Sequence, residues 1–353
     1  MNLTNVSVVV CAFNEEKFLL RCLNSIKSNI NNLDKSAEII IVDNSSFDST
    51  GNIALKFVNE NTKDLMIRYL KIAHVPLTSS RNTAISYCRG RFIVFVDADA
   101  VVDNDWLENI LSEFNENTPI VAGNIANLNS KSYFSDFIYN SHYKCSLESN
   151  RLIGANMAFK HSVFESDNGF LSATGNRGDE TLFLQEYVKN NPDMEIGFAK
   201  NSIVYNDFPN SLKEWLIQQY IGGREYLKIS KFNNQSFINF LQEILRVINV
   251  FFLPHLFIHF FIISSPLFVF HLALFLLRNI YKVKHFYCGF KNLYNQRKLL
   301  LSIFYFPVTL FGALATDMGY VFQAFISFNK EIDKGQANIS KVLHEVKSIK
   351  LID

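Results

Sequence analysis

Two aspartates, Asp97 and Asp99, stand one residue apart directly after the apolar residues 92–96. An unpaired carboxylate in an apolar setting is strongly unfavourable, so packing alone does not explain two acids at the end of a buried strand. Hard cations such as Mg²⁺ and Mn²⁺ take one or two carboxylates together with water and phosphate oxygens. The pair therefore predicts a Mg²⁺ or Mn²⁺ site that receives a nucleoside diphosphate. A solvated strand end is the alternative.

Three short apolar segments upstream of the two aspartates have the length and β-branched content of buried strands. They cover residues 5–11, 38–42 and 66–70. Apolar residues at helical spacing follow the first segment, and a further helix is predicted over residues 79–88. Alternating strands and helices predict a parallel sheet, and polar residues collect where its strands end. Ligands bind at that edge in open parallel sheets.

Four segments, taken with their order and spacing, resemble family 2 glycosyltransferases of the fold called GT-A. They are residues 8–16 (VVVCAFNEE), 41–50 (IVDNSSFDST), 80–84 (SRNTA) and 90–99 (GRFIVFVDAD). The resemblance implies an α/β fold, with a mostly parallel GT-A sheet flanked by helices, in a catalytic domain of residues 1–230. Cys11 departs from the pattern, because the family usually has proline there.

The resemblance also implies which residues bind a nucleotide-sugar donor. Ala12, Phe13 and Glu15 would line the pocket for the base and ribose. Asp43 would accept hydrogen bonds from the base, and Arg81 would be a fixed charge near the diphosphate. Core packing of Phe13 and a surface ion pair of Arg81 are the structural alternatives.

The remaining donor and metal positions follow from two further segments. Asp99 would bind the metal directly, and Asp97 would reach the ribose or a metal-bound water; Ala98 between them would line the donor site. Residues 152–159 resemble a short glycine-containing strand of the family, which adds Asn156 to the predicted donor site.

Residues 177–183 (RGDETLF) resemble the segment that carries the catalytic base. The family usually has Glu-Asp where this chain has Asp179-Glu180. Position favours Glu180 and residue type favours Asp179, so both are candidates; the alternative is that they only form the acidic first turn of a helix over residues 181–189. The family's layout implies one displacement, with a carboxylate base, that inverts the anomeric configuration.

The composition changes after about residue 245, where two long apolar runs begin, residues 247–277 and 299–328. Both exceed the roughly 18 residues that signal a bilayer-spanning helix. We therefore expect residues 231–353 to form a C-terminal helical region associated with the inner or plasma membrane, with buried soluble helices as the alternative. No apolar signal segment precedes the catalytic half, so that half is expected to face the cytoplasm.

The expected function is transfer of one sugar from a nucleotide-diphosphate sugar to a hydroxyl of a lipid-linked or cell-surface glycan acceptor. A net charge of +1 argues against a nucleic-acid partner. Two alternatives stay open. A nucleotidyltransferase would release pyrophosphate, and a non-catalytic sugar- or nucleotide-binding membrane scaffold would bind donor without turnover.

Overall fold

The computed structural model describes most of the first 230 residues and short stretches beyond them. The described residues are 5–33, 36–144, 152–165, 169–170, 178–230, 246–247, 273, 287, 291, 308–309, 311–323, 326 and 350–352. Most of the predicted membrane region, including nearly all of residues 247–277, lies outside them. Within them, no helix combines the length and the apolar character that crossing a bilayer requires.

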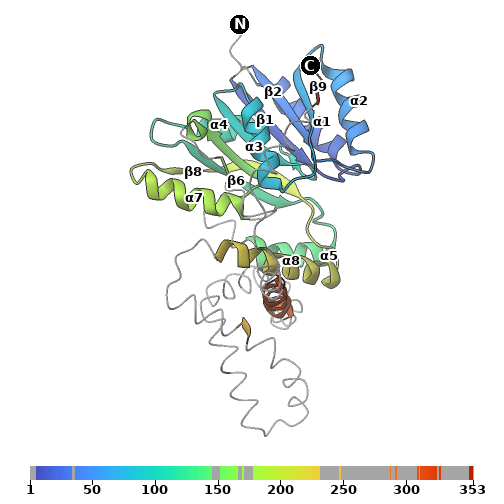
Figure 1. The fold of residues 1–353 in the computed structure, drawn as a ribbon, viewed down its shortest axis with the longest axis vertical. Coiled ribbons are helices and arrows are strands. Elements are labelled where there is room, and N and C mark those ends of the chain that lie inside the picture. Colours follow the sequence, from blue (N-terminus) through green and yellow to red (C-terminus); the bar gives the residue numbers. More distant parts are fainter. Residues whose placement is uncertain are drawn as a thin grey trace, which may run out of the picture. The chain divides into compact units, whose positions relative to one another are not determined.

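Nine strands of the described chain form one sheet, in the order β5-β8-β6-β7-β4-β1-β2-β3-β9 (Figure 1). The strands are β1 (Val6–Ala12), β2 (Ala37–Asp43), β3 (Met66–Lys71), β4 (Phe92–Asp97), β5 (Val101–Val102), β6 (Ile120–Asn127), β7 (Asn156–Lys160), β8 (Ile196–Asn206) and β9 (Lys350–Ile352). The expected parallel pairing is confirmed for β3, β2, β1 and β4. The rest of the sheet is mixed, because β7 runs antiparallel to both β4 and β6.

The register of the parallel strands brings their carboxyl ends together. Ala12 at the end of β1 pairs with Asp43 at the end of β2. Its neighbour Cys11 pairs with Asp97 at the end of β4. All of β2 is buried, and the apolar run of residues 39–42 within it is typical of a strand covered on both faces. Polar residues that follow these strands therefore meet at one edge of the sheet.

Helices cover both faces of the sheet. They are α1 (Leu19–Asn31), α2 (Thr50–Asn61), α3 (Leu77–Tyr87), α4 (Trp106–Ser112) and α7 (Asp179–Asn190). Buried side chains of α1, α2 and α4 pack together with one face of the central strands. Side chains of α3 and α7 pack in a second cluster with the opposite face. The predicted helices at residues 79–88 and 181–189 are present, and each begins two residues earlier than expected.

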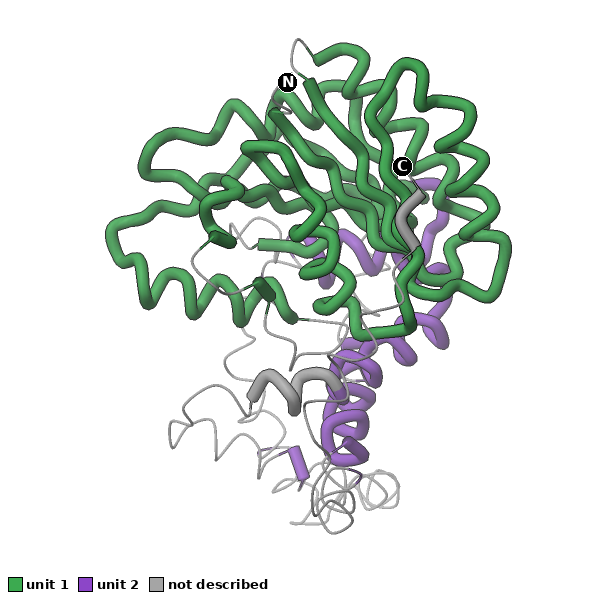
Figure 2. The backbone as a smooth tube through the Cα atoms, turned by 45° about the horizontal axis from the view of Figure 1, so that its top comes forward, with its two compact units in different colours: residues 1–129, 147–207, 338–353 green, residues 130–146, 208–337 purple. Residues whose placement is uncertain are grey.

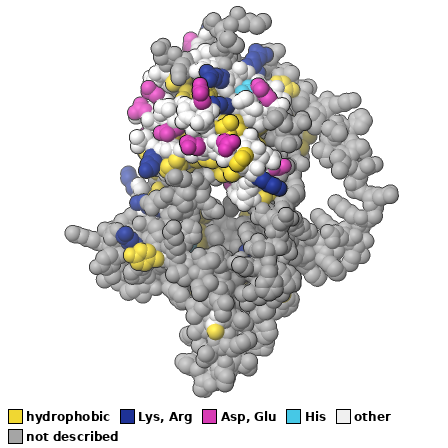
Figure 3. All heavy atoms as spheres, turned by 90° about the vertical axis from the view of Figure 1, so that its left-hand side faces the viewer, with side chains coloured by type: hydrophobic (Ala, Val, Ile, Leu, Met, Phe, Trp, Pro, Cys, Tyr) yellow, Lys and Arg dark blue, Asp and Glu magenta, His cyan; other side chains and the backbone are white. Residues whose placement is uncertain are grey.

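The chain divides into two compact units, shown in Figure 2. The first unit comprises residues 1–129, 147–207 and 338–353 and contains the sheet. The second comprises residues 130–146 and 208–337. Acidic and basic side chains are interspersed on the described surface in Figure 3, in keeping with the nearly balanced charge of the chain.

The described part of the second unit is helical. It contains α5 (Tyr133–Ile138), the short π-helix η1 (Tyr139–Tyr143), α8 (Leu212–Ser230) and a helical stretch at residues 311–323. Glycines allow close contact between α8 and this stretch: a Cβ atom on Gly223 would lie 1.9 Å from the carbonyl oxygen of Thr316. A Cβ atom on Gly319 would lie 1.9 Å from the carbonyl oxygen of Tyr220. The division places α8 with later residues, whereas the expected domain boundary was residue 230.

Candidate functional site

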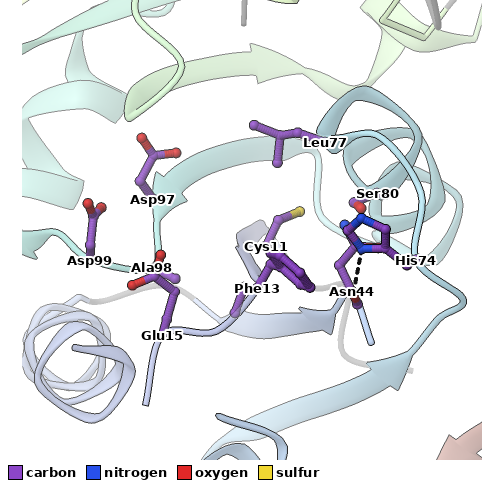
Figure 4. Close-up of a pocket in the computed structure, with 11 residues that line it drawn as sticks. Cys11, Phe13, Glu15, Asn44, His74, Leu77, Ser80, Asp97, Ala98 and Asp99 are labelled. Atoms are coloured by element: carbon purple, nitrogen blue, oxygen red, sulfur yellow. Dashed lines mark hydrogen bonds between the residues drawn. The ribbon is translucent and has the colours of Figure 1, made fainter. Parts of the chain in front are cut away.

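A pocket of about 340 Å³ lies at the carboxyl edge of the parallel strands (Figure 4). Six residues predicted from the sequence line it, all from the ends of β1 and β4: Ala12, Phe13, Glu15, Asp97, Ala98 and Asp99. The other lining residues are Cys11, Asn44, His74, Leu77 and Ser80. The pocket thus forms where the sequence predicts a ligand site, at the edge that collects the strand ends.

Three carboxylates gather on one side of the pocket, Glu15, Asp97 and Asp99 (Figure 4). Burial raises the pKa of Asp99 to about 6, and the nearby charge of Asp97 adds to the shift. Burial also raises the pKa of Glu15 to about 7, with further contributions from Asp99 and Asp97. Arg21 Nη2 donates a hydrogen bond to the backbone oxygen of Asp99 at 2.8 Å and so helps to fix the backbone at Asp99. The carboxylates repel one another, so a cation between them would be stabilised.

The acidic side of the pocket fits a cation that arrives with phosphate. Among the described residues, no group of three or more His, Cys, Asp or Glu side chains is arranged to hold a metal ion. A nucleotide-bound Mg²⁺ needs only one or two protein carboxylates, since phosphates and water complete its coordination. Asp97 and Asp99 can supply these two ligands, and the side chain of Asp97 is 40% exposed.

Aromatic rings form the opposite side. The rings of Phe13 and His74 lie 4.6 Å apart at an angle of 38°. Phe47 meets Phe13 edge to face at 5.8 Å. His74 Nδ1 lies 3.3 Å from the backbone oxygen of Asn44, the contact dashed in Figure 4. A planar ring bound here would stack against Phe13, which is 39% exposed.

His74 and Asn44 are pocket residues that the sequence did not single out. Asn44 directly follows β2, and its side chain bonds both backbone groups of Val75, accepting from the nitrogen at 2.9 Å and donating to the oxygen at 2.7 Å. His74 lies shortly after β3. The available signal was their place after strands of the parallel sheet, the same signal that marks Asp97.

Asp43 is fully buried and does not line the pocket. Its Oδ1 accepts from the backbone nitrogen of Ser46 at 2.9 Å, and its Oδ2 accepts from the Tyr69 hydroxyl at 2.8 Å. Oδ1 thus holds the loop after β2 in place, and Oδ2 ties the end of β2 to β3. The predicted hydrogen bonds from Asp43 to a bound base stay a prediction.

Arg81 is also buried, and it joins two halves of the site. Its Nη1 donates to both carboxylate oxygens of Asp179, at 2.9 and 2.7 Å. Its Nη2 lies 3.5 Å from Asp97 Oδ1 and donates to the backbone oxygen of Gly154 at 3.3 Å. The alternative of a surface ion pair is wrong, because only 4% of the residue is exposed. The predicted fixed charge is present, but it is directed at Asp179.

Asp179 and Glu180 form the first turn of α7, after Gly178 in a left-handed conformation with φ of 80°. Asp179 is fully buried and committed to Arg81. Burial and the adjacent Asp179 raise the pKa of Glu180, while Arg81 lowers it to a smaller extent. A carboxylate with a raised pKa is a stronger proton acceptor near neutral pH, which makes Glu180 the better candidate base of the two.

Asn156 does not line the pocket, and its expected contact with a donor stays a prediction. Its side chain is fully buried at the start of β7. It accepts from Trp106 Nε1 at 2.9 Å and donates to the backbone oxygens of Asn124 at 2.8 Å and Ser202 at 2.9 Å. These bonds tie β7 to β6, β8 and α4, so the structure gives Asn156 a structural role.

Replacing Asn156 with Ala is expected to lower the free energy of unfolding by at least about 2 kcal/mol, because two buried polar partners and one partly buried partner lose their hydrogen bond. Urea unfolding measures this. Asn109→Ala is the control, since Asn109 makes one exposed bond, to the backbone of Asn201, and should change stability by no more than about 0.5 kcal/mol. Normal stability with lost ligand binding in Asn156→Ala would restore the predicted binding role.

Comparisons with known proteins agree with the geometry. The family model described as "Glycosyl transferase family 2" matches residues 7–170, and that described as "Glycosyl transferase family group 2" matches residues 92–315. Glycosyltransferase GlyA of Streptococcus pneumoniae is 30% identical over 125 residues, which are 35% of this chain and 17% of that protein. The glucosyltransferase WfgD of Escherichia coli, named as acting from UDP-Glc on alpha-D-GlcNAc-diphosphoundecaprenol, is 28% identical over 38% of this chain and 50% of that protein. The matches thus span no more than half of either relative.

One solved structure shares the fold over nearly the whole chain. It is the mannosyltransferase PcManGT of Pyrobaculum calidifontis, in complex with GDP-Man and Mn²⁺. The TM-score is 0.57 at 15% sequence identity, and the match covers 91% of this chain and 87% of that one. At this identity the similarity shows a common fold.

Proposed function

Because the chain belongs to glycosyl transferase family 2, we propose that it is an inverting glycosyltransferase that moves one sugar from a nucleoside-diphosphate sugar to an acceptor hydroxyl. The observation that carries the proposal is one pocket with an aromatic side, formed by Phe13 and His74, and an acidic side, formed by Asp97 and Asp99. Such a pair of surfaces suits the two ends of a nucleoside diphosphate, since a base stacks on aromatic rings and a diphosphate requires a cation.

The donor is proposed to bind with its base against Phe13 and with Mg²⁺ or Mn²⁺ held by Asp99 and Asp97. The fold relative from Pyrobaculum was solved with GDP-Man and Mn²⁺, which supports a nucleotide sugar and a divalent cation here. When bound, the cation stabilises the negative charge that develops on the departing diphosphate. Ala12 and Ala98 are small, buried residues of the pocket, and their size leaves room for the ligand.

In the proposed reaction Glu180 takes the proton from the acceptor hydroxyl as the oxygen attacks the anomeric carbon. The new glycosidic bond forms on the face opposite the breaking bond to the diphosphate, so the configuration inverts. Asp179 is the poorer base, since its two oxygens already accept from Arg81. The leaving group departs as a nucleoside diphosphate.

Phe13→Ala is expected to weaken nucleotide binding by about 1–3 kcal/mol, roughly 5- to 150-fold in dissociation constant, because a stacking surface for the base is lost. Calorimetry with the free nucleoside diphosphate and Mn²⁺ measures the change. Tyr133→Ala is the control, because Tyr133 is an exposed aromatic residue, 66% accessible, that does not line the pocket. Equal losses in the two variants, or none in Phe13→Ala, would contradict this binding mode.

A donor screen tests the proposed substrate class. Calorimetric titration of the full chain with a panel of nucleotide sugars, each with and without Mn²⁺, should identify at least one donor that binds only when the cation is present. If no nucleotide sugar binds under either condition, the proposed function fails. If a donor binds equally well in EDTA, the proposed nucleotide-sugar substrate is supported and the proposed cation is contradicted.

The acceptor is proposed to be a lipid-linked or cell-surface glycan, with residues 231–353 attaching the enzyme to the membrane and the catalytic domain facing the cytoplasm. The long apolar runs of the sequence support attachment. The lipid diphosphate acceptor named for the relative from Escherichia coli supports the acceptor class.

Membrane attachment predicts that the full chain sediments with membranes at high speed, resists extraction by high salt and is released by detergent. If only exposed charges held the protein on the membrane surface, high salt would screen that attraction and release the protein. Recovery of the full chain in the supernatant without detergent would contradict attachment. Digestion by protease added to inside-out vesicles, but not to right-side-out ones, is expected for a catalytic domain on the cytoplasmic side.

A further inference from the structure

The middle of helix α3 (Leu77–Tyr87) holds two segments that come much later in the chain. Arg81 contacts Gly154 and Asp179. Asn82, the next residue, donates to the backbone oxygen of Phe170 at 2.7 Å and accepts from its nitrogen at 2.8 Å. Two adjacent side chains of α3 thus hold the segments before β7 and before α7 against the parallel half of the sheet.

Glycines allow both contacts. A Cβ atom on Gly154 would lie 2.6 Å from Arg81 Nη2, and one on Gly169 would lie 2.3 Å from Asn82 Oδ1. Neither glycine has the left-handed backbone conformation that favours glycine over other residues. They are needed because the two side chains of α3 approach the backbone closely.

The charge of Arg81 is directed mainly at Asp179. A buried guanidinium requires carboxylate partners, because an unpaired charge in the interior is strongly unfavourable. Asp179 provides two oxygens within 2.9 Å, whereas the nearest oxygen of Asp97 is 3.5 Å away. The rings of Phe95 and Phe170 lie 6.0 and 5.8 Å from the guanidinium carbon and limit its movement.

We propose that Arg81 is a positioning residue that fixes Glu180 through Asp179, rather than a ligand of the donor diphosphate. Asp179 is the first residue of α7 and Glu180 the second, so the ion pair sets where the helix begins relative to β4 and the pocket. Lysine cannot replace the arginine fully, since a single ammonium point charge lacks the planar fork that orients the pair. The role of Glu180 rests on the proposed function, but the anchoring of α7 does not.

Hydrogen exchange tests the anchoring without any enzyme assay. In Arg81→Gln, amides in the first turns of α7, such as that of Leu182, which bonds to Gly178 at 3.1 Å, should exchange about tenfold faster or more. The matched control is Arg68→Gln, which removes another largely buried arginine, paired with Glu38 at 2.6 Å in the first half of β2. It should leave exchange in α7 as in the wild type. Unchanged exchange in a folded Arg81→Gln variant would overturn the proposal.

If Arg81→Gln does not fold, Arg81→Lys keeps the buried charge and carries the same test. We expect intermediate exchange in α7 with a melting temperature closer to the wild type. Wild-type exchange in Arg81→Lys, together with weakened donor binding, would identify Arg81 as a diphosphate ligand and overturn the proposal.

Kinetics then separate positioning from donor binding. Arg81→Gln should lower kcat by tenfold or more while the donor dissociation constant stays within about twofold; a diphosphate ligand would show the reverse. The pH profiles should shift in opposite directions, because Arg81 lowers the pKa of Glu180 and Asp179 raises it. The acidic limb of kcat should therefore move to higher pH in Arg81→Gln and to lower pH in Asp179→Asn. Limbs that move together would overturn the proposal.

Failure of the proposed function can be distinguished from failure of the anchoring of α7. Absence of sugar transfer by the wild type refutes the transferase and leaves the exchange result to decide whether Arg81 anchors α7.

Discussion

Glu180→Gln is expected to lower turnover by roughly 10²- to 10⁴-fold while donor affinity stays near the wild-type value. Glutamine keeps the shape of the side chain and removes the proton acceptor, and general base catalysis contributes about that factor to the rate. Donor affinity should be spared because the base acts on the acceptor hydroxyl in the transition state. Single-turnover kinetics and calorimetry with the same donor measure the two quantities separately.

The pH dependence gives this prediction a second readout. A base works only when deprotonated, so wild-type turnover should fall as pH drops through the pKa of Glu180. Burial and Asp179 raise that pKa, so the acidic limb should lie above the ordinary glutamate value of about 4.3. Glu180→Gln should lose the limb along with most of the rate.

Asp179→Asn is the companion variant that decides between the two acids. It should reduce turnover less than Glu180→Gln, because it disturbs the position of the base without removing it. If Asp179→Asn is inactive and Glu180→Gln keeps most of its activity, Asp179 is the base and the assignment from position is wrong.

Asp99→Asn is expected to abolish cation-dependent donor binding. An amide is neutral and is a weaker ligand for a hard cation than a carboxylate. Loss of groups that only support a metal ligand already lowers affinity by about 10- to 100-fold, so loss of a direct ligand should lower it by about 100-fold or more. Titration of the donor in Mn²⁺ and in EDTA measures the effect.

The control for Asp99→Asn is Asp105→Asn, which removes an exposed aspartate that does not line the pocket. Its donor affinity should match the wild type. If Asp99→Asn also binds donor within a few fold of the wild type in Mn²⁺, Asp99 is not a metal ligand.

The parallel half of the fold could be predicted because its signals are local. Unbroken apolar runs mark β1, β2 and β4, and the polar residues that follow them mark one edge of the sheet. Ligands bind at the carboxyl ends of parallel strands, and this rule, together with the family resemblance, was enough to identify Phe13, Glu15, Asp97 and Asp99 as pocket residues. It did not extend to β7, whose antiparallel direction depends on long-range pairing that a short apolar run does not encode.

The contacts of Arg81 and Asn156 could not be predicted for a similar reason. Arg81 and Asp179 lie 98 positions apart, and no local pattern indicates that a buried arginine needs that particular carboxylate. The short segment around Asn156 resembled a donor-binding strand, but its side chain bonds to groups of β6, β8 and α4 that are buried or partly buried. The backbone pattern was informative, while the direction of individual side chains depended on packing.

The identity of the nucleotide product tests the central claim most directly. The full chain, in detergent and Mn²⁺, is incubated with a nucleotide sugar that binds in the donor screen and with a membrane lipid extract as acceptor, and the products are separated by chromatography. Release of a nucleoside diphosphate together with a glycosylated acceptor of inverted anomeric configuration is the predicted result, and Glu180→Gln should release about 100-fold less or lower still. Release of pyrophosphate would indicate a nucleotidyltransferase. Donor binding without any product would indicate a scaffold that binds sugar nucleotides and does not transfer them.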